Sequence, residues 1–429
     1  MKKKKWLYLS VATLLIMIPI LRIVILRVNG SLNPVDLAAY SAVSRALFEG
    51  NNPFPDHTEF LFTYLGEEVP IVYPGQMLLF ALPAYIWGNT LQIIYILINI
   101  IVMFFLVALT LVKACGFQWS DFRTPGEKQL CYALCVFLCS VSTNNMTIIR
   151  TGQIVLILTL CLYGMFWGPR SNLLRICLFA FIAVTKYSIL TVFAPILFFK
   201  GHWKLCIYSF CIFVLLSLSP VICGNNLVEV FQGYFKAVKI LFQPGQCNHY
   251  DMCTLMCHLG FFKISIINHL LKIIVVGIIL WLCWREWKNE YFSDTLLMLS
   301  LSLTMLISYH GFHDIVLIFP LFLIRLFDFV KTKQWFQFVG TLTFFVYCII
   351  PGTILLHISS WIGKIPRIDS IIYLVNNPWG FKLQHVFPIT PFFTIALTLW
   401  SLYLYLHVKE PYRFEIPASN KSVPPQKQD

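Results

Sequence analysis

Residues 6–25 read WLYLSVATLLIMIPILRIVI, and this run decides the class of fold. An α-helix of about 20 mostly apolar residues is long enough to span the hydrocarbon core of a bilayer. Comparable runs occur at Leu91–Val112 and Trp335–His357. Across all 429 residues, 58% are hydrophobic and 12% are charged, which is about half the charge of a soluble domain. The sequence therefore predicts an all-α polytopic membrane protein.

About twelve membrane-spanning segments are predicted, which form one domain over residues 1–410. They cover residues 6–28, 90–113, 129–142, 153–168, 173–185, 187–200, 205–222, 270–284, 293–309, 313–330, 335–357 and 391–408. Because Lys2–Lys5 precede a long apolar run without a small-residue cleavage site, the first segment is interpreted as an uncleaved span. Residues 411–429 are polar and proline-rich, and they are predicted to form a disordered cytoplasmic tail.

Basic residues gather in the short loops, and the positive-inside rule places these loops in the cytoplasm. The loops contain Lys2–Lys5, Lys113–Lys128, Arg170–Arg175, Lys200–Lys204, Arg285–Lys288, Lys331–Lys333 and the tail from Lys409. An even number of spans then places both termini in the cytoplasm, as expected for a multi-pass protein of the cytoplasmic (inner) membrane. The rule also accounts for most of the net charge of +13, so no nucleic acid partner is implied.

Two neighbouring spans, 173–185 and 187–200, are short and meet at Lys186. Such lengths fit helices buried in a bundle, or a hairpin that stops at an aqueous cavity. A lysine at this place is costly unless it pairs with an anion. No acidic residue lies within thirty positions of Lys186 on either side. Its partner must therefore come from elsewhere in the fold or from a ligand.

Long outer segments are predicted at residues 29–89, 223–269 and 358–390. In the first, the apolar positions of Val35–Phe48 follow a helical spacing, which favours a helix lying in the membrane interface. Gln76–Trp87 is too short to span and is predicted as a second juxtamembrane helix. Asp36 falls in the first turn of the first helix, where the helix dipole favours an ionised carboxylate. Such a carboxylate can act as a general base, or it can simply face solvent.

Several short motifs support a resemblance to a known superfamily. The pattern D-x-x-x-Y from Asp36 to Tyr40, the following LFEGNNPF and the later Tyr73-Pro74 resemble the GT-C superfamily of membrane glycosyltransferases. The most similar group is glycosyltransferase family 87, which is α-mannosyltransferase-like. TGQI at Thr151–Ile154, AVTKY at Ala183–Tyr187 and YHGFHD at Tyr309–Asp314 resemble further segments of that family. The order and spacing of these motifs carry the resemblance, which covers most of residues 6–330.

The chain also departs from the family pattern. Gly75 follows Tyr73-Pro74 where the family usually has a second proline, and no asparagine follows Gln153. Asp36 is not part of a D-x-D motif, so neither a metal site nor another cofactor is predicted. The spacing of Cys247, Cys253 and Cys257 matches no common zinc pattern. Because their loop is predicted to lie outside the cytoplasm, a disulfide among these three and Cys223, or free thiols, is favoured over zinc.

The resemblance implies a GT-C-type bundle and a hexosyltransferase reaction. A polyprenyl-phosphate-linked sugar, a mannose-like hexose or a pentose, would be the donor, and a glycolipid or glycan hydroxyl would be the acceptor. Asp36, in the outer loop 29–89, would be the general base of a single inverting displacement. The leaving lipid phosphate requires cationic groups. The candidate substrate-binding and phosphate-binding residues are Lys186, Arg150, Gln153, His310, His313, Tyr73 and Tyr40, with Asp314 as a candidate to orient a histidine.

Other interpretations of the sequence remain open. Arg150 could anchor to lipid headgroups, and the histidines could be packing residues. A transporter or a lipid or polysaccharide flippase would share the topology and the broken helices. The long outer loop that carries Asp36 and the lack of a visible inverted repeat weigh against it. A non-catalytic subunit of a polysaccharide pathway is a third possibility.

Overall fold

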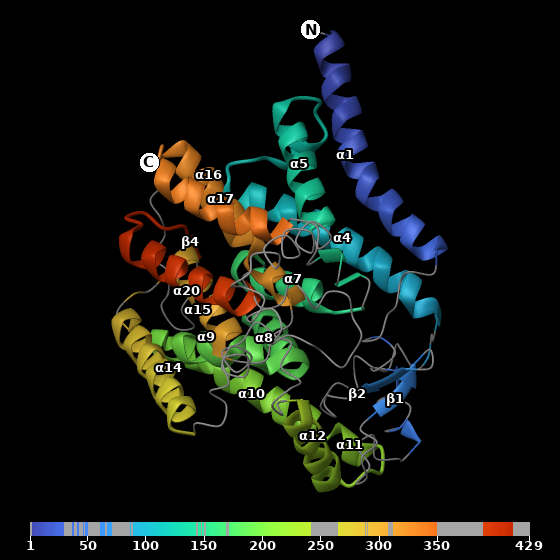
Figure 1. Cartoon of the computed structure of the whole chain (residues 1–429), viewed down its shortest axis with the longest axis vertical. Coiled ribbons are helices and arrows are strands. Elements are labelled where there is room, and N and C mark those ends of the chain that lie inside the picture. The colour runs from blue at the N-terminus through green and yellow to red at the C-terminus, as the bar shows by residue number, and fades with distance from the viewer. Residues whose placement is uncertain are drawn as a thin grey trace, which may run out of the picture.

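The computed structural model describes residues 2–29, 61–64, 67–70, 89–142, 152–168, 171–241, 265–287, 291–307, 312–349 and 389–414, with isolated positions between them. Helices dominate this part of the chain (Figure 1). The α-helices are α1 (Lys2–Val28), α4 (Asn89–Ala114), α5 (Glu127–Val141), α7 (Val155–Trp167), α8 (Asn172–Lys186), α9 (Leu190–Leu197), α10 (Trp203–Ser217), α11 (Ser219–Ile222), α12 (Leu227–Leu241), α14 (Ser265–Glu286), α15 (Asp294–Ile307), α16 (Phe319–Lys331), α17 (Trp335–Ile349) and α20 (Ile389–His407). Shorter helical turns are η2 (Trp119–Phe122), η3 (Tyr187–Ile189), η4 (Phe198–His202) and η6 (Phe312–Ile318).

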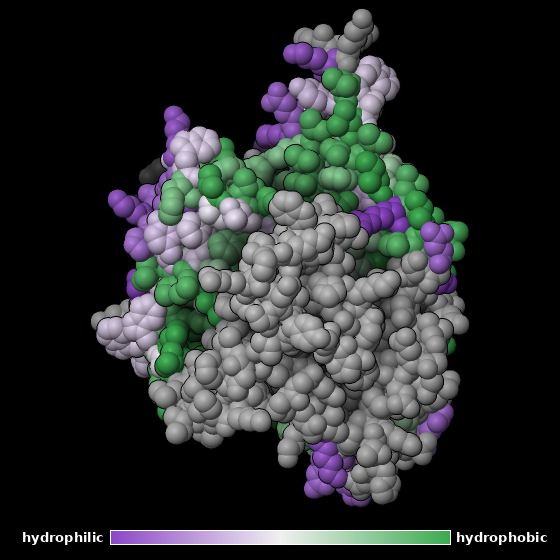
Figure 2. All heavy atoms as spheres, in the orientation of Figure 1, coloured by the Kyte–Doolittle hydropathy of each residue, from purple (hydrophilic) through white to green (hydrophobic). Residues whose placement is uncertain are grey.

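Apolar helices confirm that this is a membrane protein. Within the described residues, three helical segments are long and apolar enough to cross a bilayer: Lys4–Val28, Ile93–Ala114 and Asn172–Ile222, the last with internal breaks. Four shorter apolar helices are Val155–Trp167, Asp294–Ile307, Trp335–Ile349 and Phe393–His407. Most predicted spans coincide with helices to within a few residues, but the total of twelve stays a prediction. Hydrophobic side chains cover the surface over α1 and α4 (Figure 2), as expected for a surface in contact with lipid.

The centre of the bundle is formed by α15. Every residue from Asp294 to Leu306 is buried, including the hydroxyl-bearing Ser300 and Thr304. These two side chains donate hydrogen bonds to backbone carbonyl oxygens four residues earlier, at 2.7 Å in both cases. A helix that is apolar on all sides and satisfies its hydroxyl groups internally is suited to complete burial. It packs against α9 and α20.

The predicted break at Lys186 is the tip of a helical hairpin. Lys186 has φ −151° and ψ 70°, so it leaves helical geometry, and η3 follows it. On α10, the Ser209 hydroxyl donates to the Ile176 carbonyl oxygen at 3.1 Å, and the Cys206 thiol donates to the Ala194 carbonyl oxygen at 3.8 Å. One stretch of α10 therefore contacts both α8 and α9, which means that the chain reverses between them. Of the two arrangements that the sequence allows, the structure contains the hairpin.

Two small antiparallel sheets were not predicted. Strand β1 (Leu61–Tyr64) pairs with β2 (Glu67–Pro70) inside the first outer loop. Their aromatic and β-branched residues favour extended backbone, a local signal that helical periodicity does not detect. Strand β3 (Phe292–Ser293) pairs with β4 (Arg413–Phe414), and Phe414 is buried. Residues 411–414 of the predicted tail are therefore ordered, whereas 415–429 lie outside the described residues.

Candidate functional site

Lys186 forms a buried ion pair with an acid that is distant in sequence. Its Nζ lies 2.6 Å from Oδ1 and 2.7 Å from Oδ2 of Asp314, in η6. The Asp314 side chain is 0% exposed and the Lys186 side chain is 19% exposed. Buried charges occur in proteins when they are paired and hydrogen-bonded. An ammonium has three N–H donors, so two directed at Asp314 leave one for a further acceptor on the exposed side of Lys186.

Next to the ion pair, two tyrosines join the hairpin tip to an outer helix. The hydroxyl oxygens of Tyr187, in η3, and Tyr234, in α12, are 3.0 Å apart. The inner side of α12 carries Val230 and Tyr234, which are both buried. Burial, and then the hydrogen bond with Tyr187, raise the pKa of Tyr234 well above that of a free tyrosine. The Tyr234 hydroxyl therefore remains protonated across the physiological pH range and available as a donor.

The TGQ turn lies against the first outer loop. Gly152 has φ +81°, a conformation that glycine adopts without the cost of a Cβ. The amides of Gly152 and Gln153 both donate to the Ile148 carbonyl oxygen, at 2.9 and 3.0 Å. A Cβ on Gly152 would lie 2.7 Å from Cγ and 3.2 Å from the backbone nitrogen of Leu37. Leu37 directly follows Asp36 in the chain, so the glycine allows the segment of the predicted base to approach this turn.

The helix directions bring Gln153 and Lys186 to one end of the bundle. Helices α7 and α8 are antiparallel, because Arg175 Nε donates to the Met165 carbonyl oxygen at 3.1 Å near the opposite end of the pair. The residue before α7 and the last residue of α8 therefore lie at the same end. The turn η6 packs along α7, where the Tyr163 hydroxyl donates to the Leu317 carbonyl oxygen at 2.9 Å. Of three segments singled out in the sequence, those of Lys186 and Asp314 are in contact, and the segment of the half-buried Gln153 lies at the same end of the α7–α8 pair.

Several predicted site residues cannot be placed. Asp36, Tyr40, Tyr73, Arg150 and His310 lie outside the described residues, as do the three cysteines Cys247, Cys253 and Cys257. The backbone of His313 belongs to η6, but its side chain is outside the described part of the structure. Within the described ranges, no three His, Cys, Asp or Glu side chains are grouped so that they could hold a metal ion.

The sequence did not predict the role of Asp314 at Lys186. The structure places the Asp314 carboxylate on the lysine, and the expectation that Asp314 orients a histidine stays a prediction, since the side chains of His310 and His313 lie outside the described residues. A signal was present, since each is an isolated charge beside a long apolar run and each needs an opposite charge. The contact between Leu37 and Gly152 and the Tyr187–Tyr234 pair had no such signal. They depend on how distant segments pack.

A second buried charge cluster lies at the far end of the α8–α9 hairpin. Lys200, in η4, donates to Glu286 Oε2 at 2.9 Å, with the two side chains 0% and 6% exposed. Glu286 also accepts from the Tyr405 hydroxyl at 2.5 Å and from the Asn289 amide at 3.1 Å. Each acceptor oxygen of Glu286 is satisfied by groups from other segments. The cluster ties α14 and α20 to the hairpin and is complete as a structural unit.

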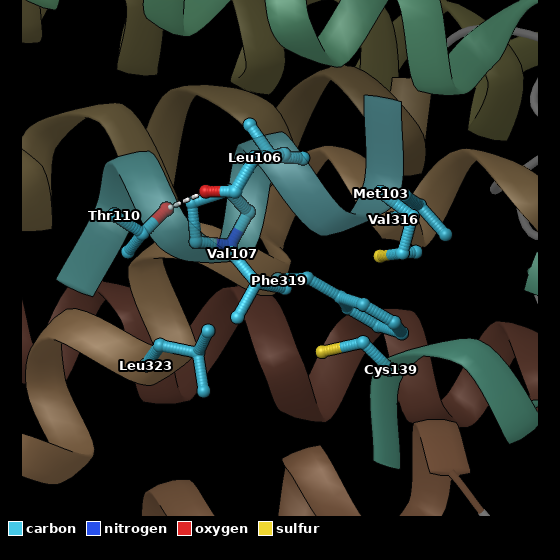
Figure 3. Close-up of a pocket in the computed structure, with 9 residues that line it drawn as sticks. Met103, Leu106, Val107, Thr110, Cys139, Val316, Phe319 and Leu323 are labelled. Atoms are coloured by element: carbon cyan, nitrogen blue, oxygen red, sulfur yellow. Dashed lines mark hydrogen bonds between the residues drawn. The ribbon is translucent and has the colours of Figure 1, made fainter. Parts of the chain in front are cut away.

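An apolar cavity of about 230 Å³, including its open mouth, lies between α4, α5 and η6–α16 (Figure 3). Its lining is formed by Met103, Leu106, Val107, Thr110, Cys139, Val316, Phe319, Pro320 and Leu323. The Thr110 hydroxyl donates to the Leu106 carbonyl oxygen at 2.7 Å and is therefore satisfied within its own helix. The lining contains no acid, lysine, arginine or histidine. This cavity therefore provides no charged group for binding a phosphate or for acid–base chemistry.

Comparison with known proteins agrees with the motifs. The model of glycosyltransferase family 87 matches residues 72–308, which is more than half of the chain. The matched region includes Gln153 and Lys186, begins after Asp36 and ends before Asp314. No curated protein and no solved structure matches. The chain belongs to glycosyltransferase family 87.

Proposed function

We propose that this glycosyltransferase moves a mannose-like hexose or a pentose from a polyprenyl-phosphate-linked sugar to a hydroxyl of a glycolipid or glycan. The reaction would take place at the outer face of the cytoplasmic membrane, with both termini in the cytoplasm. The observation that carries the proposal is the Lys186–Asp314 ion pair, at the same end of the bundle as a glycine turn that approaches Leu37, the residue after Asp36. A membrane glycosyltransferase with a charged donor requires such a polar site at the end of an apolar bundle.

In the proposed reaction, Asp36 removes the proton from the acceptor hydroxyl. The hydroxyl oxygen attacks the anomeric carbon while the bond from that carbon to the phosphate oxygen breaks, so the configuration inverts. The electron pair of the broken bond leaves with the lipid phosphate. Directed N–H donors that stabilise developing negative charge lower such a barrier. Lys186 supplies one, and Arg150, His310 and His313 are further candidates.

Asp314 limits the positive charge that Lys186 can offer to the donor phosphate. Because the carboxylate already compensates the ammonium, the pair brings little net charge to the donor phosphate. Its contribution is a lysine fixed in place, with one N–H donor left for the donor phosphate. Gln153, Tyr40 and Tyr73 are proposed to hydrogen-bond the substrates, since amide and phenol groups suit sugar hydroxyls.

The test uses purified protein in nanodiscs with short-chain polyprenyl-phosphate-linked mannose, glucose, galactose and arabinose. A membrane lipid extract provides the acceptors, and mass spectrometry detects new glycosides. Asp36→Asn should lower transfer by about 10²–10⁴-fold, the usual effect of losing a positioned base, without weakening donor binding. Asp121→Asn, a change in the predicted cytoplasmic loop, is the control. Near-normal turnover of Asp36→Asn would assign the base to another residue.

Lys186→Met is best examined together with Asp314→Asn, so that no buried charge is left unpaired. The double variant should raise the donor concentration needed for half-maximal rate, and Lys186→Arg alone should retain part of the affinity. Lys128→Met is the matched control, because Lys128 pairs with Asp121 at an exposed site. If the donor affinity is unchanged, the donor phosphate is bound by Arg150 or by His310 and His313 and not by Lys186.

The helical hairpin broken at a charged residue is also a feature that transporters use near their substrate sites. The same nanodisc protein is therefore reconstituted into liposomes that contain the labelled lipid-linked sugar. Movement of this lipid between leaflets without any new glycoside would favour a flippase over the transferase.

A further inference from the structure

The tip of the α8–α9 hairpin directs two consecutive side chains to two different elements. Lys186 contacts Asp314 in η6, and Tyr187 contacts Tyr234 in α12. The Cα atoms of consecutive residues lie about 3.8 Å apart. A ligand group held by the Lys186 ammonium therefore lies at the same hairpin tip as Tyr187.

The ring of Tyr187 is fixed at one end and open over its surface. Its hydroxyl is hydrogen-bonded to a tyrosine that is itself 7% exposed, whereas Tyr187 is 47% exposed. A tyrosine that only fills space in a bundle would bury its ring and expose its hydroxyl, because the ring is the apolar part. In Tyr187 the hydroxyl is hydrogen-bonded within the protein while 47% of the residue stays exposed. An anchored, open aromatic face beside a cation is suited to a ligand that has both a charged and a weakly apolar part.

A lipid-phosphate-linked sugar has a charged part, the phosphate, followed directly by a weakly apolar part, the sugar ring. This is the order of the cation Lys186 and the aromatic residue Tyr187 along the chain. The phosphate is covalently bonded to the anomeric carbon, so the group that binds the phosphate fixes the position of the sugar ring. One face of a hexose carries C–H bonds that suit an aromatic ring, and its rim carries hydroxyls that suit a phenol. We propose that Tyr187, held by Tyr234, is the contact surface for the donor sugar and helps to determine which sugar is accepted. This inference rests on the proposed function.

The experiment compares two probes that differ only in the sugar. One is a short-chain polyprenyl phosphate and the other is the same lipid phosphate bearing mannose, and both are titrated against protein in nanodiscs. Tyr187→Ala should weaken binding of the mannosyl lipid about 3- to 10-fold, the range expected for loss of an aromatic contact, and leave the bare lipid phosphate unchanged. Tyr187→Phe, which retains the ring, and Tyr234→Phe should each cause a smaller loss.

The Lys186→Met/Asp314→Asn variant should weaken both probes equally, which separates the phosphate contact from the sugar contact. Tyr208→Ala is the matched control, since Tyr208 on α10 is 52% exposed and belongs to no motif. If Tyr187→Ala does not fold, Tyr187→Leu replaces it as a bulky side chain without an aromatic face.

The outcomes distinguish the two proposals. If the wild-type protein binds neither probe, the proposed function itself fails. If both probes bind and Tyr187→Ala affects neither, Tyr187 is an interfacial anchor of the kind found at membrane surfaces, and the inference is overturned. An equal loss for both probes would also overturn it, because Tyr187 would then act only by shaping the hairpin tip.

Discussion

Lys186 Nζ lies within 2.7 Å of both carboxylate oxygens of Asp314, although 128 residues separate them in the chain. This pair fastens the tip of the α8–α9 hairpin to η6 and makes the charged tip compatible with an apolar bundle. A lysine with this burial would otherwise carry a large desolvation cost. The two residues are therefore expected to depend on each other.

Removing one charge of this pair should destabilise the protein more than removing both charges. Asp314→Asn leaves the ammonium without its counter-ion, and the expected loss of stability is about 3 kcal/mol. Lys186→Met/Asp314→Asn, which removes both charges, should recover much of the loss. Thermal unfolding in detergent measures the four members of this double-mutant cycle. Strictly additive effects would show that the two side chains do not interact.

Replacing Gly152 by alanine should be harmful because the added methyl group meets Leu37, whereas the same change at Gly116 meets no neighbouring atom. Gly152 and Gly116 have similar positive φ values of 81° and 77°, but a Cβ on Gly116 would meet no atom within 4 Å. Ala at position 116 should cost about 1 kcal/mol for the backbone conformation alone. Ala at position 152 should also displace Leu37 and the neighbouring Asp36, and so lower transfer activity.

The companion variant for this test is Gly152→Ala/Leu37→Ala. Shortening the leucine makes space for the added methyl group, so transfer activity should rise above that of Gly152→Ala. Glycoside formation and melting temperature are measured for all four proteins. Equal losses of activity at positions 116 and 152 would show that the contact with Leu37 has no catalytic importance.

Glu286 should be a stability residue without a role in the reaction. Glu286→Leu leaves Lys200 buried without its counter-ion, and the expected cost is about 3 kcal/mol. Because this cluster lies at the far end of the hairpin, the donor affinity of the folded fraction should stay unchanged. Glu229→Leu, an exposed position on α12, is the control. A loss of donor affinity at unchanged melting temperature would contradict this assignment.

The predicted topology places the first loop and the C-terminus on opposite sides of the membrane. Cysteine introduced at Ser31 should react with a membrane-impermeant maleimide in intact cells, whereas cysteine at Asp429 should react only after the membrane is opened. The unmodified protein, which has 14 cysteines, provides the background signal. Labelling of both positions from the same side would exclude an even number of spans.

Many residues of the candidate site could be identified from the sequence, but the contacts between them could not be predicted from it. Gln153 was singled out by the resemblance of its segment to the family, and the break at Lys186 was predicted because a polar residue between apolar runs is a local signal. The sheet β1–β2 was missed, since its strands are too short for a periodic pattern to be recognised. The order of residues 411–414 was missed because it depends on pairing with Phe292–Ser293, more than a hundred positions earlier.

The sequence by itself determined the membrane class, the positions of most helices and the need of Lys186, between two short apolar segments, for an anion. These properties follow from hydrophobic run length and from the cost of an unpaired charge, which operate within a short stretch of chain. Only the tertiary structure decided that the anion belongs to Asp314, that Leu37 approaches Gly152 and that Tyr187 is held by Tyr234. Each of these contacts joins segments that are distant along the chain. No local sequence pattern specifies such partners, so the packing of the helices determines them.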